Sequence, residues 1–270
     1  MKRTVKEVKG RKYIIEEFTS YNELLNTNDS RTQNFGCART DTDNRWRGCT
    51  YDEAVEMLRY GWEDKDKLSL INNKIKELEK KQEVYKMSFK NDIVGYAPIV
   101  PLALRGVPQN MINCTRKPKK AKVVHLIIDI GVTANFSAEE KLNWGAEMVA
   151  KIMNLEKQGF RVRIDITKVQ SERGRYGTVH ALLLPVKNEN QPFDIKRLMF
   201  PIAHAGMQRR ITFDWYERCP EAQELGGYGC SIGQQSKEDR EDKVKNIIST
   251  ENSYLICCME NIDEALKGVK

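Results

Sequence analysis

The chain has 270 residues, of which 40% are hydrophobic and 31% are charged, and its formal net charge is +7. This mix is typical of a globular protein with a buried core and excludes a fully disordered chain. No apolar run approaches the roughly 18 residues of a membrane span, and the N-terminus lacks the apolar region of a secretory signal. We therefore expect a cytoplasmic protein that does not contact a membrane.

The seven cysteines predict free thiols rather than disulfides or a metal site. Their number is odd, their spacing is irregular and no Cys-x-x-Cys pair occurs among them. Disulfide frameworks belong to exported proteins with even cysteine counts, and structural zinc sites need closely spaced Cys or His ligands. The chain has only three histidines, so we expect no cofactor.

The beginning of the chain predicts one strand followed by helices. Residues 12–18 are rich in apolar side chains and indicate a strand, whereas residues 26–47 are polar and indicate a long loop. A Ser or Thr followed by Glu three residues later is the capping box that opens a helix. The sequence has three such pairs, Ser20–Glu23, Thr50–Glu53 and Ser137–Glu140.

A longer helix is expected over residues 67–89, where apolar residues recur on one face and Lys and Glu cover the other. This pattern fits a solvated helix packed along one side, and it also fits a coiled-coil arm for self-association. Residues 95–118 are rich in Pro and Gly and indicate an irregular linker that ends in a basic run. We therefore divide the chain into a mainly helical region over 1–118 and an α/β core over 119–270.

The second half of the chain predicts a βαβ unit extended by two further strands. The unbroken apolar run at 123–130 is typical of a strand that is buried on both faces. A helix follows the Ser137 cap, and further strands are expected at 160–166, 178–186 and 254–258. Numbered in chain order, these four strands fit the sheet order 3-2-1-4, with the third strand antiparallel at the edge. The predicted fold class is α/β, with a small Rossmann-like or von Willebrand A-like sheet.

Asp129 and Thr133 are the candidate metal ligands. The loop from Asp129 to Thr133 is similar to the Asp-x-Ser-x-Ser metal site of von Willebrand A domains, whose oxygen atoms suit a hard cation such as Mg²⁺. Gly131 stands where the first hydroxyl would be, so one ligand is missing. In the alternative interpretation, Asp129 simply ends a buried strand and caps the turn that follows.

Asp129, His204 and Arg210 are the candidate catalytic residues. A histidine beside arginines can bind phosphate or transfer a proton, because the guanidinium fork matches phosphate oxygens. The alternative is that His204 is structural and bonds to the backbone. An enzyme that acts on a phosphate-containing substrate requires Asp129, Thr133, His204 and Arg210 to converge on one space at the carboxyl ends of the strands.

Basic residues in two parts of the chain are the candidate nucleic-acid contacts. Lysine and arginine side chains that gather on a surface can neutralise phosphates, and a nearby aromatic ring such as Trp46 can stack on a base. An ordinary solvated surface is the alternative. The candidates are Arg45, Arg47, Arg116, Lys117, Lys119 and Lys120.

Three groups of motifs resemble a bacteriophage and prophage family of unknown function. The resemblance spans about residues 18–220 and implies a phage-type origin, but it assigns no catalytic residue. The motifs are Trp46-Arg47-Gly48-Cys49-Thr50-Tyr51-Asp52-Glu53-Ala54 with Gly61-Trp62; Ser137-Ala138-Glu139 with Trp144-Gly145-Ala146 and Gly159-Phe160-Arg161-Val162; and Phe200-Pro201-Ile202-Ala203-His204 with Arg209-Arg210, Phe213 and Glu217.

Three functions are consistent with these features. The first is a phage-type, non-enzymatic binding protein whose partner is nucleic acid, a host or phage protein, or further copies of the chain. The second is an enzyme that acts on a phosphate-containing substrate. The third is a structural or assembly component of a virion. The first is favoured, because the sequence has no recognisable Walker loop, Gly-x-Ser-x-Gly elbow or His-Glu-x-x-His site.

Overall fold

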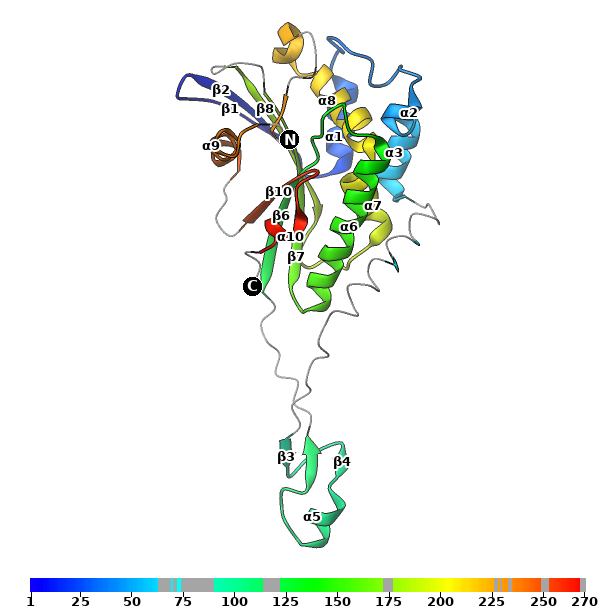
Figure 1. The fold of residues 1–270 in the computed structure, drawn as a ribbon, viewed down its shortest axis with the longest axis vertical. Coiled ribbons are helices and arrows are strands. Elements are labelled where there is room, and N and C mark those ends of the chain that lie inside the picture. Colours follow the sequence, from blue (N-terminus) through cyan, green and yellow to red (C-terminus); the bar gives the residue numbers. More distant parts are fainter. Residues whose placement is uncertain are drawn as a thin grey trace.

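A computed structural model describes residues 1–62, 69, 72–73, 90–113, 122–171, 177–225, 228, 230–232, 235–248 and 253–267 (Figure 1). In chain order, the elements are β1 (Lys2–Val8), β2 (Arg11–Glu17), α1 (Tyr21–Ser30), α2 (Asn44–Arg47), α3 (Tyr51–Tyr60), β3 (Lys90–Asp92), β4 (Ala97–Pro98), α5 (Val100–Leu104), β5 (Met111–Asn113), β6 (Val123–Asp129), α6 (Ala138–Lys157), β7 (Arg161–Ser171), β8 (Val179–Lys187), α7 (Ile195–Ala203), a π-helix (Met207–Thr212), α8 (Phe213–Glu217), a 3₁₀-helix (Pro220–Leu225), β9 (Cys230–Ser231), α9 (Lys237–Ile247), β10 (Ser253–Cys257) and α10 (Ile262–Ala265).

A mixed sheet with the order β1-β2-β8-β7-β6-β10 forms the centre of the fold, and β9 pairs with β7. Strands β7, β6 and β10 are parallel, β8 is antiparallel to β7, and β2 is parallel to β8. The helix α6 connects β6 to β7, as the βαβ pattern of the sequence predicts. The protein therefore has an α/β fold built on one mixed sheet.

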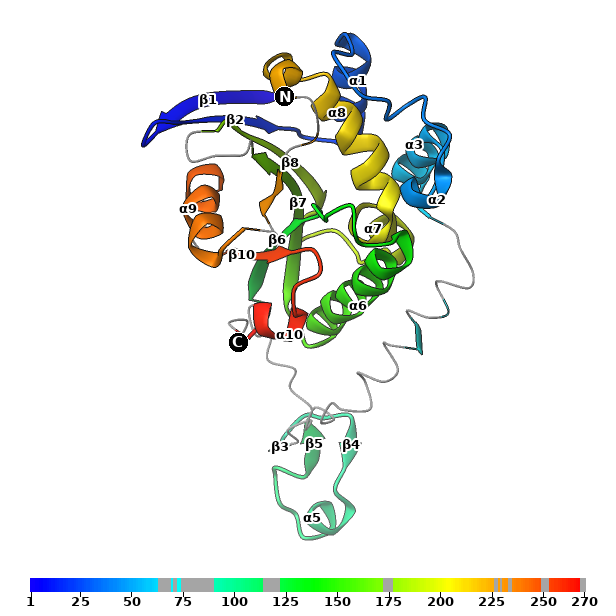
Figure 2. The same ribbon diagram turned by 45° about the horizontal axis from the view of Figure 1, so that its top comes forward.

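The two faces of the sheet are covered unequally. The larger apolar core includes Leu126, Ile128, Val149 and Trp215, and it lies on the face covered by α6, α7 and α8 (Figures 1 and 2). A smaller core on the other face joins Tyr13 and neighbouring strand residues to the helix α9. Burial of these side chains stabilises the fold by roughly 25 cal/mol for each Å² of apolar surface removed from water.

Two expectations about the sheet and the N-terminal half are not confirmed. The expected strand at residues 12–18 is present as β2, but β1 precedes it and both strands join the main sheet, so this region contributes strands to the sheet as well as helices. As a consequence, β8 is not the edge strand, because β2 pairs with its other side. Within this longer sheet, the four predicted strands keep the relative order β8-β7-β6-β10, and β8 is antiparallel to β7, but the predicted four-stranded, von Willebrand A-like sheet is not confirmed. The helix expected over residues 67–89 falls almost entirely outside the described residues.

The Pro-rich stretch expected as an irregular linker contains regular structure. β3, β4 and β5 form a small sheet with the order β3-β5-β4, and α5 lies between β4 and β5. Proline fits here because the strands are only two or three residues long and Pro101 stands in the first turn of α5. Among the helices of the described ranges, none is both long and apolar enough to cross a membrane.

Candidate functional site

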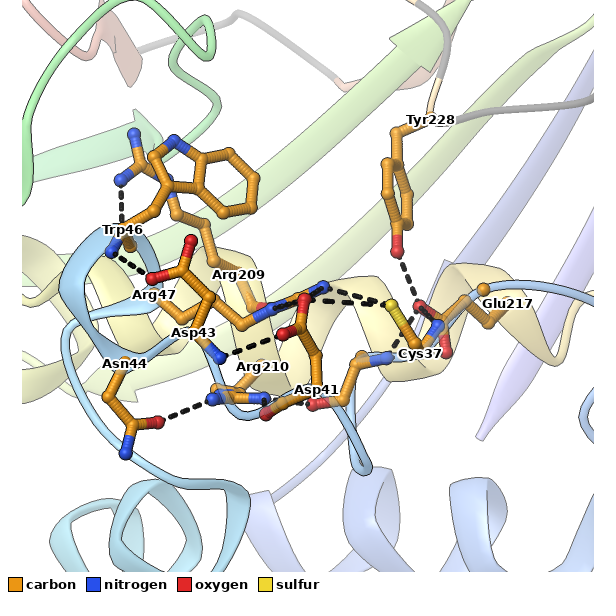
Figure 3. Close-up of polar contacts among 12 residues, drawn as sticks. Cys37, Asp41, Asp43, Asn44, Trp46, Arg47, Arg209, Arg210, Glu217 and Tyr228 are labelled. Atoms are coloured by element: carbon orange, nitrogen blue, oxygen red, sulfur yellow. Dashed lines mark hydrogen bonds and ion pairs between the residues drawn. The ribbon is translucent and has the colours of Figure 1, made fainter.

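Hydrogen bonds from the Arg210 side chain hold the loop over residues 36–49 against the protein core (Figure 3). Its side chain extends from the π-helix and is fully buried. The guanidinium donates hydrogen bonds to the carbonyl oxygens of Cys49 at 2.8 Å and of Ala38 and Asp41 at 2.9 Å, and to Asn44 Oδ1 at 2.7 Å. A phosphate could reach this group only by displacing the loop, so Arg210 positions backbone in this structure rather than a substrate.

Arg47 and Arg209 also hold the loop over residues 36–49 against the protein core (Figure 3). Arg47 is 3% exposed, and its Nε and Nη2 donate to Asp41 Oδ2 at 3.0 and 2.8 Å. Arg209 is fully buried, donates to the carbonyl oxygens of Trp46 and Phe136, and lies 4.3 Å from the centre of the Trp46 ring. Arg47, a predicted nucleic-acid contact, is therefore buried, and its guanidinium forms hydrogen bonds within the protein.

Glu217 holds the beginning of the loop. Its buried carboxylate accepts backbone N–H bonds from Cys37 at 3.1 Å and Ala38 at 2.9 Å, and the Tyr228 hydroxyl donates to it at 2.6 Å. A Cβ atom on Gly36, whose φ is +81°, would lie only 2.4 Å from the Glu217 side chain. The loop over residues 36–49 is therefore held by buried side chains at both of its ends, and its residues Gly48 and Cys49 form part of the wall of the neighbouring cleft.

That cleft has a volume of about 730 Å³, which is in the range of pockets for small ligands or side chains. Its walls are the loop residues next to Gly48, one side of α3, the first turns of α6 and the end of α7. The residues that line it are Gly48, Cys49, Glu53, Glu56, Met57, Tyr60, Gly61, Trp62, Ala138, Glu139, Leu142, His204 and Ala205.

His204 lies in this cleft with its ring orientation fixed. The backbone N–H of Gly206 donates to Nδ1 at 3.0 Å, so a neutral imidazole carries its proton on Nε2. Phe200 stacks on the ring with 5.3 Å between centroids, and Trp62 meets it edge-on at 4.9 Å. The structure thus gives His204 the backbone bond that the structural interpretation expected, and it also places the ring at a cleft.

The cleft has an acidic rim. Glu53, Glu56 and Glu139 are exposed, and no lysine or arginine is found among the described residues that line the cleft. The backbone N–H and hydroxyl of Thr50 donate to Glu53 at 2.8 and 2.9 Å, which keeps the pKa of that carboxyl below its ordinary value. Burial raises the pKa of the Cys49 thiol to about 12. The cleft is therefore suited to hold a cation and lacks an activated thiolate.

Asp129 lies in a separate, buried cluster at the carboxyl end of β6. Its Oδ1 accepts the backbone N–H groups of Gly131 and Val169 at 3.3 Å, and its Oδ2 is buried without a hydrogen-bond partner among the described residues. Burial raises the pKa of this carboxyl to about 6, although the ammonium groups of Lys168 and Lys141 act in the opposite direction. Lys141 itself donates to the Ile130 carbonyl oxygen at 3.0 Å.

The required convergence of Asp129, Thr133, His204 and Arg210 is not seen. Asp129 does not line the cleft of His204, and Arg210 is fastened to the loop. Two buried ammonium groups next to Asp129 also disfavour a metal ion at that position. No group of three potential metal-ligating His, Cys, Asp or Glu side chains occurs in the described part of the chain.

The six basic residues predicted to contact nucleic acid differ in their exposure, and the structure does not describe all of them. Arg45 is exposed on α2, whereas Arg47 is buried. Arg116, Lys117, Lys119 and Lys120 lie outside the described residues. Sequence reasoning missed the acidic cleft, although one signal was present: Glu53 and Glu56 are one helical turn apart on α3, and Gly61-Trp62 closes the same helix.

One family model matches the chain. It is described as a domain of unknown function (DUF7192), and the match covers residues 3–268. No curated protein and no solved structure matches the chain.

Proposed function

The chain belongs to the DUF7192 family, and from this premise and the geometry of the cleft we propose that it is a non-enzymatic binding protein whose cleft holds a lysine or arginine side chain of a protein partner. The observation that carries the proposal is the combination of three exposed carboxylates with a fixed aromatic wall and no cationic lining residue in the described chain. The phage-type origin implied by the sequence motifs belongs to the same proposal, with a phage or host protein as the partner.

The negative charge of the rim favours a positively charged ligand. Glu56 and Glu139 stand on two different helices, so a cation between them would be attracted from both sides. Glu53 stays ionised because Thr50 lowers the pKa of its carboxyl. A phosphate in the same space would be repelled, and this argues against an enzyme for phosphate-containing substrates at this cleft.

The uncharged lining suits the rest of a basic side chain. Met57, Leu142 and Ala138 provide apolar surface against which the methylene groups of lysine or arginine can pack. Trp62 adds a ring face for the cation, an interaction worth about 0.5–1 kcal/mol at exposed sites. Its position is fixed because its backbone N–H donates to the Lys196 carbonyl oxygen at 2.9 Å.

The test is binding of fluorescein-labelled hexalysine and hexaarginine peptides, followed by fluorescence anisotropy at low and high salt. The double variant Glu56→Gln with Glu139→Gln should bind about tenfold more weakly, because each exposed carboxylate contributes up to about 1 kcal/mol. The matched control is Asp52→Asn with Glu264→Gln, which removes the same charge from exposed positions that do not line the cleft. Equal losses in both variants, or tighter binding of a hexaglutamate peptide, would contradict the proposal.

A second candidate function, as an assembly component, is favoured by a specific apolar surface. Five large apolar side chains are 59–84% exposed on the small unit formed by β3, β4, β5 and α5, an unusual share for so few residues. They are Ile93, Val94, Tyr96, Val100 and Leu104. If copies of the chain associate through this surface, light scattering should give the mass of an oligomer, and Leu104→Asp should return the protein to a monomer. A monomer at high concentration would remove this candidate.

A further inference from the structure

The hairpin of β1 and β2 has its free end beyond the rest of the sheet. In the part of the chain that the structure describes, β2 pairs with β8 only from Tyr13 onward, and no third strand is described beside Arg11, Lys12 and their partners on β1. Figure 2 shows this end of the hairpin extending past β8. Lys9 and Gly10 form the turn with φ values of 52° and 75°, the left-handed conformation that tight hairpins require.

The hairpin carries an unusual share of the positive charge. Residues 2–12 contain six lysines and arginines and one glutamate, a net charge of +5, whereas the whole chain carries +7. Residues 116–122 carry another five cations without an anion, so the remainder of the chain is net negative. Glu16 and Glu17 at the end of β2 bring the whole hairpin to +3, which is also the net charge of residues 6–12 alone, so the excess positive charge lies at the turn end of the hairpin.

The cations lie on both faces of the hairpin. Cross-strand pairs share a face, and the register pairs Lys6 with Tyr13, Glu7 with Lys12 and Val8 with Arg11. Lys6 and Arg11 thus project from the face on which Tyr13 packs toward α9, and Lys12 projects from the other face, opposite Glu7. Lys6 and Lys12 are exposed, and Lys9 at the tip makes a 3.1 Å ion pair with Asp242 whose partners are 78% and 45% exposed. Such an exposed pair is weak and can exchange for a phosphate.

We propose that the β1–β2 hairpin binds duplex DNA by entering the major groove. The major groove of B-DNA is wide enough for a two-stranded ribbon, and its two walls are lines of phosphates. A ribbon with cations on both of its faces can contact the phosphates of both walls of the groove. A flat anionic surface, such as that of a lipid vesicle, would contact only one face of the hairpin. The deep, narrow major groove of duplex RNA does not admit such a ribbon. This inference is independent of the acidic cleft and of its peptide ligand.

The experiment measures anisotropy of a fluorescent DNA duplex titrated with the full chain over a range of salt concentrations. In the triple variant Lys6→Gln, Lys9→Gln, Lys12→Gln, we expect weaker binding and a smaller dependence on salt. The slope of log K against log salt should fall by about 0.9 for each phosphate contact removed. Exposed substitutions of this kind leave the fold intact, and circular dichroism checks that it is retained.

The matched control removes three exposed cations elsewhere, with Lys157→Gln, Arg161→Gln and Lys267→Gln. It should retain the affinity and the salt slope of the unmodified chain apart from a small effect of net charge. Absence of duplex binding, or equal losses in the two triple variants, would overturn the proposal. Tighter binding to an RNA duplex, to single-stranded DNA or to anionic lipid vesicles would overturn it as well, because the groove argument applies only to duplex DNA.

Discussion

Gly48 lies directly against the imidazole of His204. A Cβ atom at Gly48 would be 3.1 Å from Cε1 of His204, and the glycine has a φ of +86°. Gly48 is also the residue that ends α2, so the same position turns the chain and forms part of the cleft wall. The loop and His204 therefore pack against each other at Gly48, and a substitution at either position should disturb the conformation of the other.

The variant Gly48→Ala tests this constraint. The left-handed backbone costs an L-residue about 1–2 kcal/mol, and the added methyl group also pushes on the imidazole. We expect the free energy of unfolding, measured in urea, to fall by at least about 1 kcal/mol. Gly106→Ala is the control, because that glycine has a φ of +71° but no atom within 4 Å of its added Cβ. If only the first variant also weakens peptide binding, the contact with His204 matters beyond backbone strain.

Arg210 should contribute much more to stability than the exposed Arg45. In Arg210→Met, the buried carbonyl oxygens of Cys49 and Ala38 lose their donor, and so do the partly buried acceptors on Asp41 and Asn44. Unsatisfied buried acceptors cost about 1–3 kcal/mol each, so we expect a loss of roughly 3–5 kcal/mol in urea unfolding. Trypsin should also cut faster at the arginines of the loop, whereas Arg45→Met should leave the free energy of unfolding nearly unchanged. A stable, protease-resistant Arg210→Met variant would show that the loop is held by other contacts.

Local signals in the sequence predicted the starts of three helices. Thr50–Glu53 and Ser137–Glu140 form complete capping boxes at the starts of α3 and α6, and Ser20 caps α1. Such motifs are predictable because both partners lie within one turn of the chain. The strand β1 was not predicted, and the reason again lies in its local sequence. Its sequence is mostly charged and its side chains are exposed, as is common for an edge strand, so it lacks the apolar alternation that identifies a strand.

The candidate site depended on contacts that leave no local pattern. Arg210 bonds to carbonyl oxygens of residues more than 150 positions earlier, and every residue type has a carbonyl oxygen. The sequence therefore presents Arg209-Arg210 as a phosphate-binding pair, although the fold uses both as internal supports. The cleft likewise requires α3, α6 and α7 to meet, and this packing is a property of the whole fold.

The cysteines should differ in reactivity according to burial. Cys37 is half-buried, whereas Cys49, Cys219, Cys257 and Cys258 are buried. Burial raises the pKa of Cys49 to about 12 and that of Cys258 to about 11, so little thiolate is present at neutral pH. After brief treatment with iodoacetamide, peptide mass spectrometry should find Cys37 modified first among these five. Equally fast labelling of Cys49 would mean that the loop opens readily, in conflict with its attachment to Arg210.

Asp129 should make stability depend on pH in mildly acidic solution. Its pKa is about 6 in the fold and 3.8 ordinarily, because burial disfavours the charged carboxylate. The protonated form is therefore favoured by folding, and this stabilisation is complete below pH 3.8 and is lost as pH rises through about 6. The loss amounts to about 3 kcal/mol, since one pKa unit corresponds to roughly 1.4 kcal/mol.

Urea unfolding of the unmodified chain and of Asp129→Asn at several pH values between 4 and 7 isolates this effect. An amide cannot ionise, so the difference in free energy of unfolding between variant and unmodified chain should move in favour of the variant as pH rises. Other carboxylates cancel in this difference, and Asp52→Asn, at an exposed position, should show no such trend. The neighbouring Lys141, whose pKa burial lowers to about 8, titrates outside this window and should not obscure it. A difference that stays constant would mean that Asp129 ionises in the fold as easily as in water, which would require water or a cation to reach its buried Oδ2.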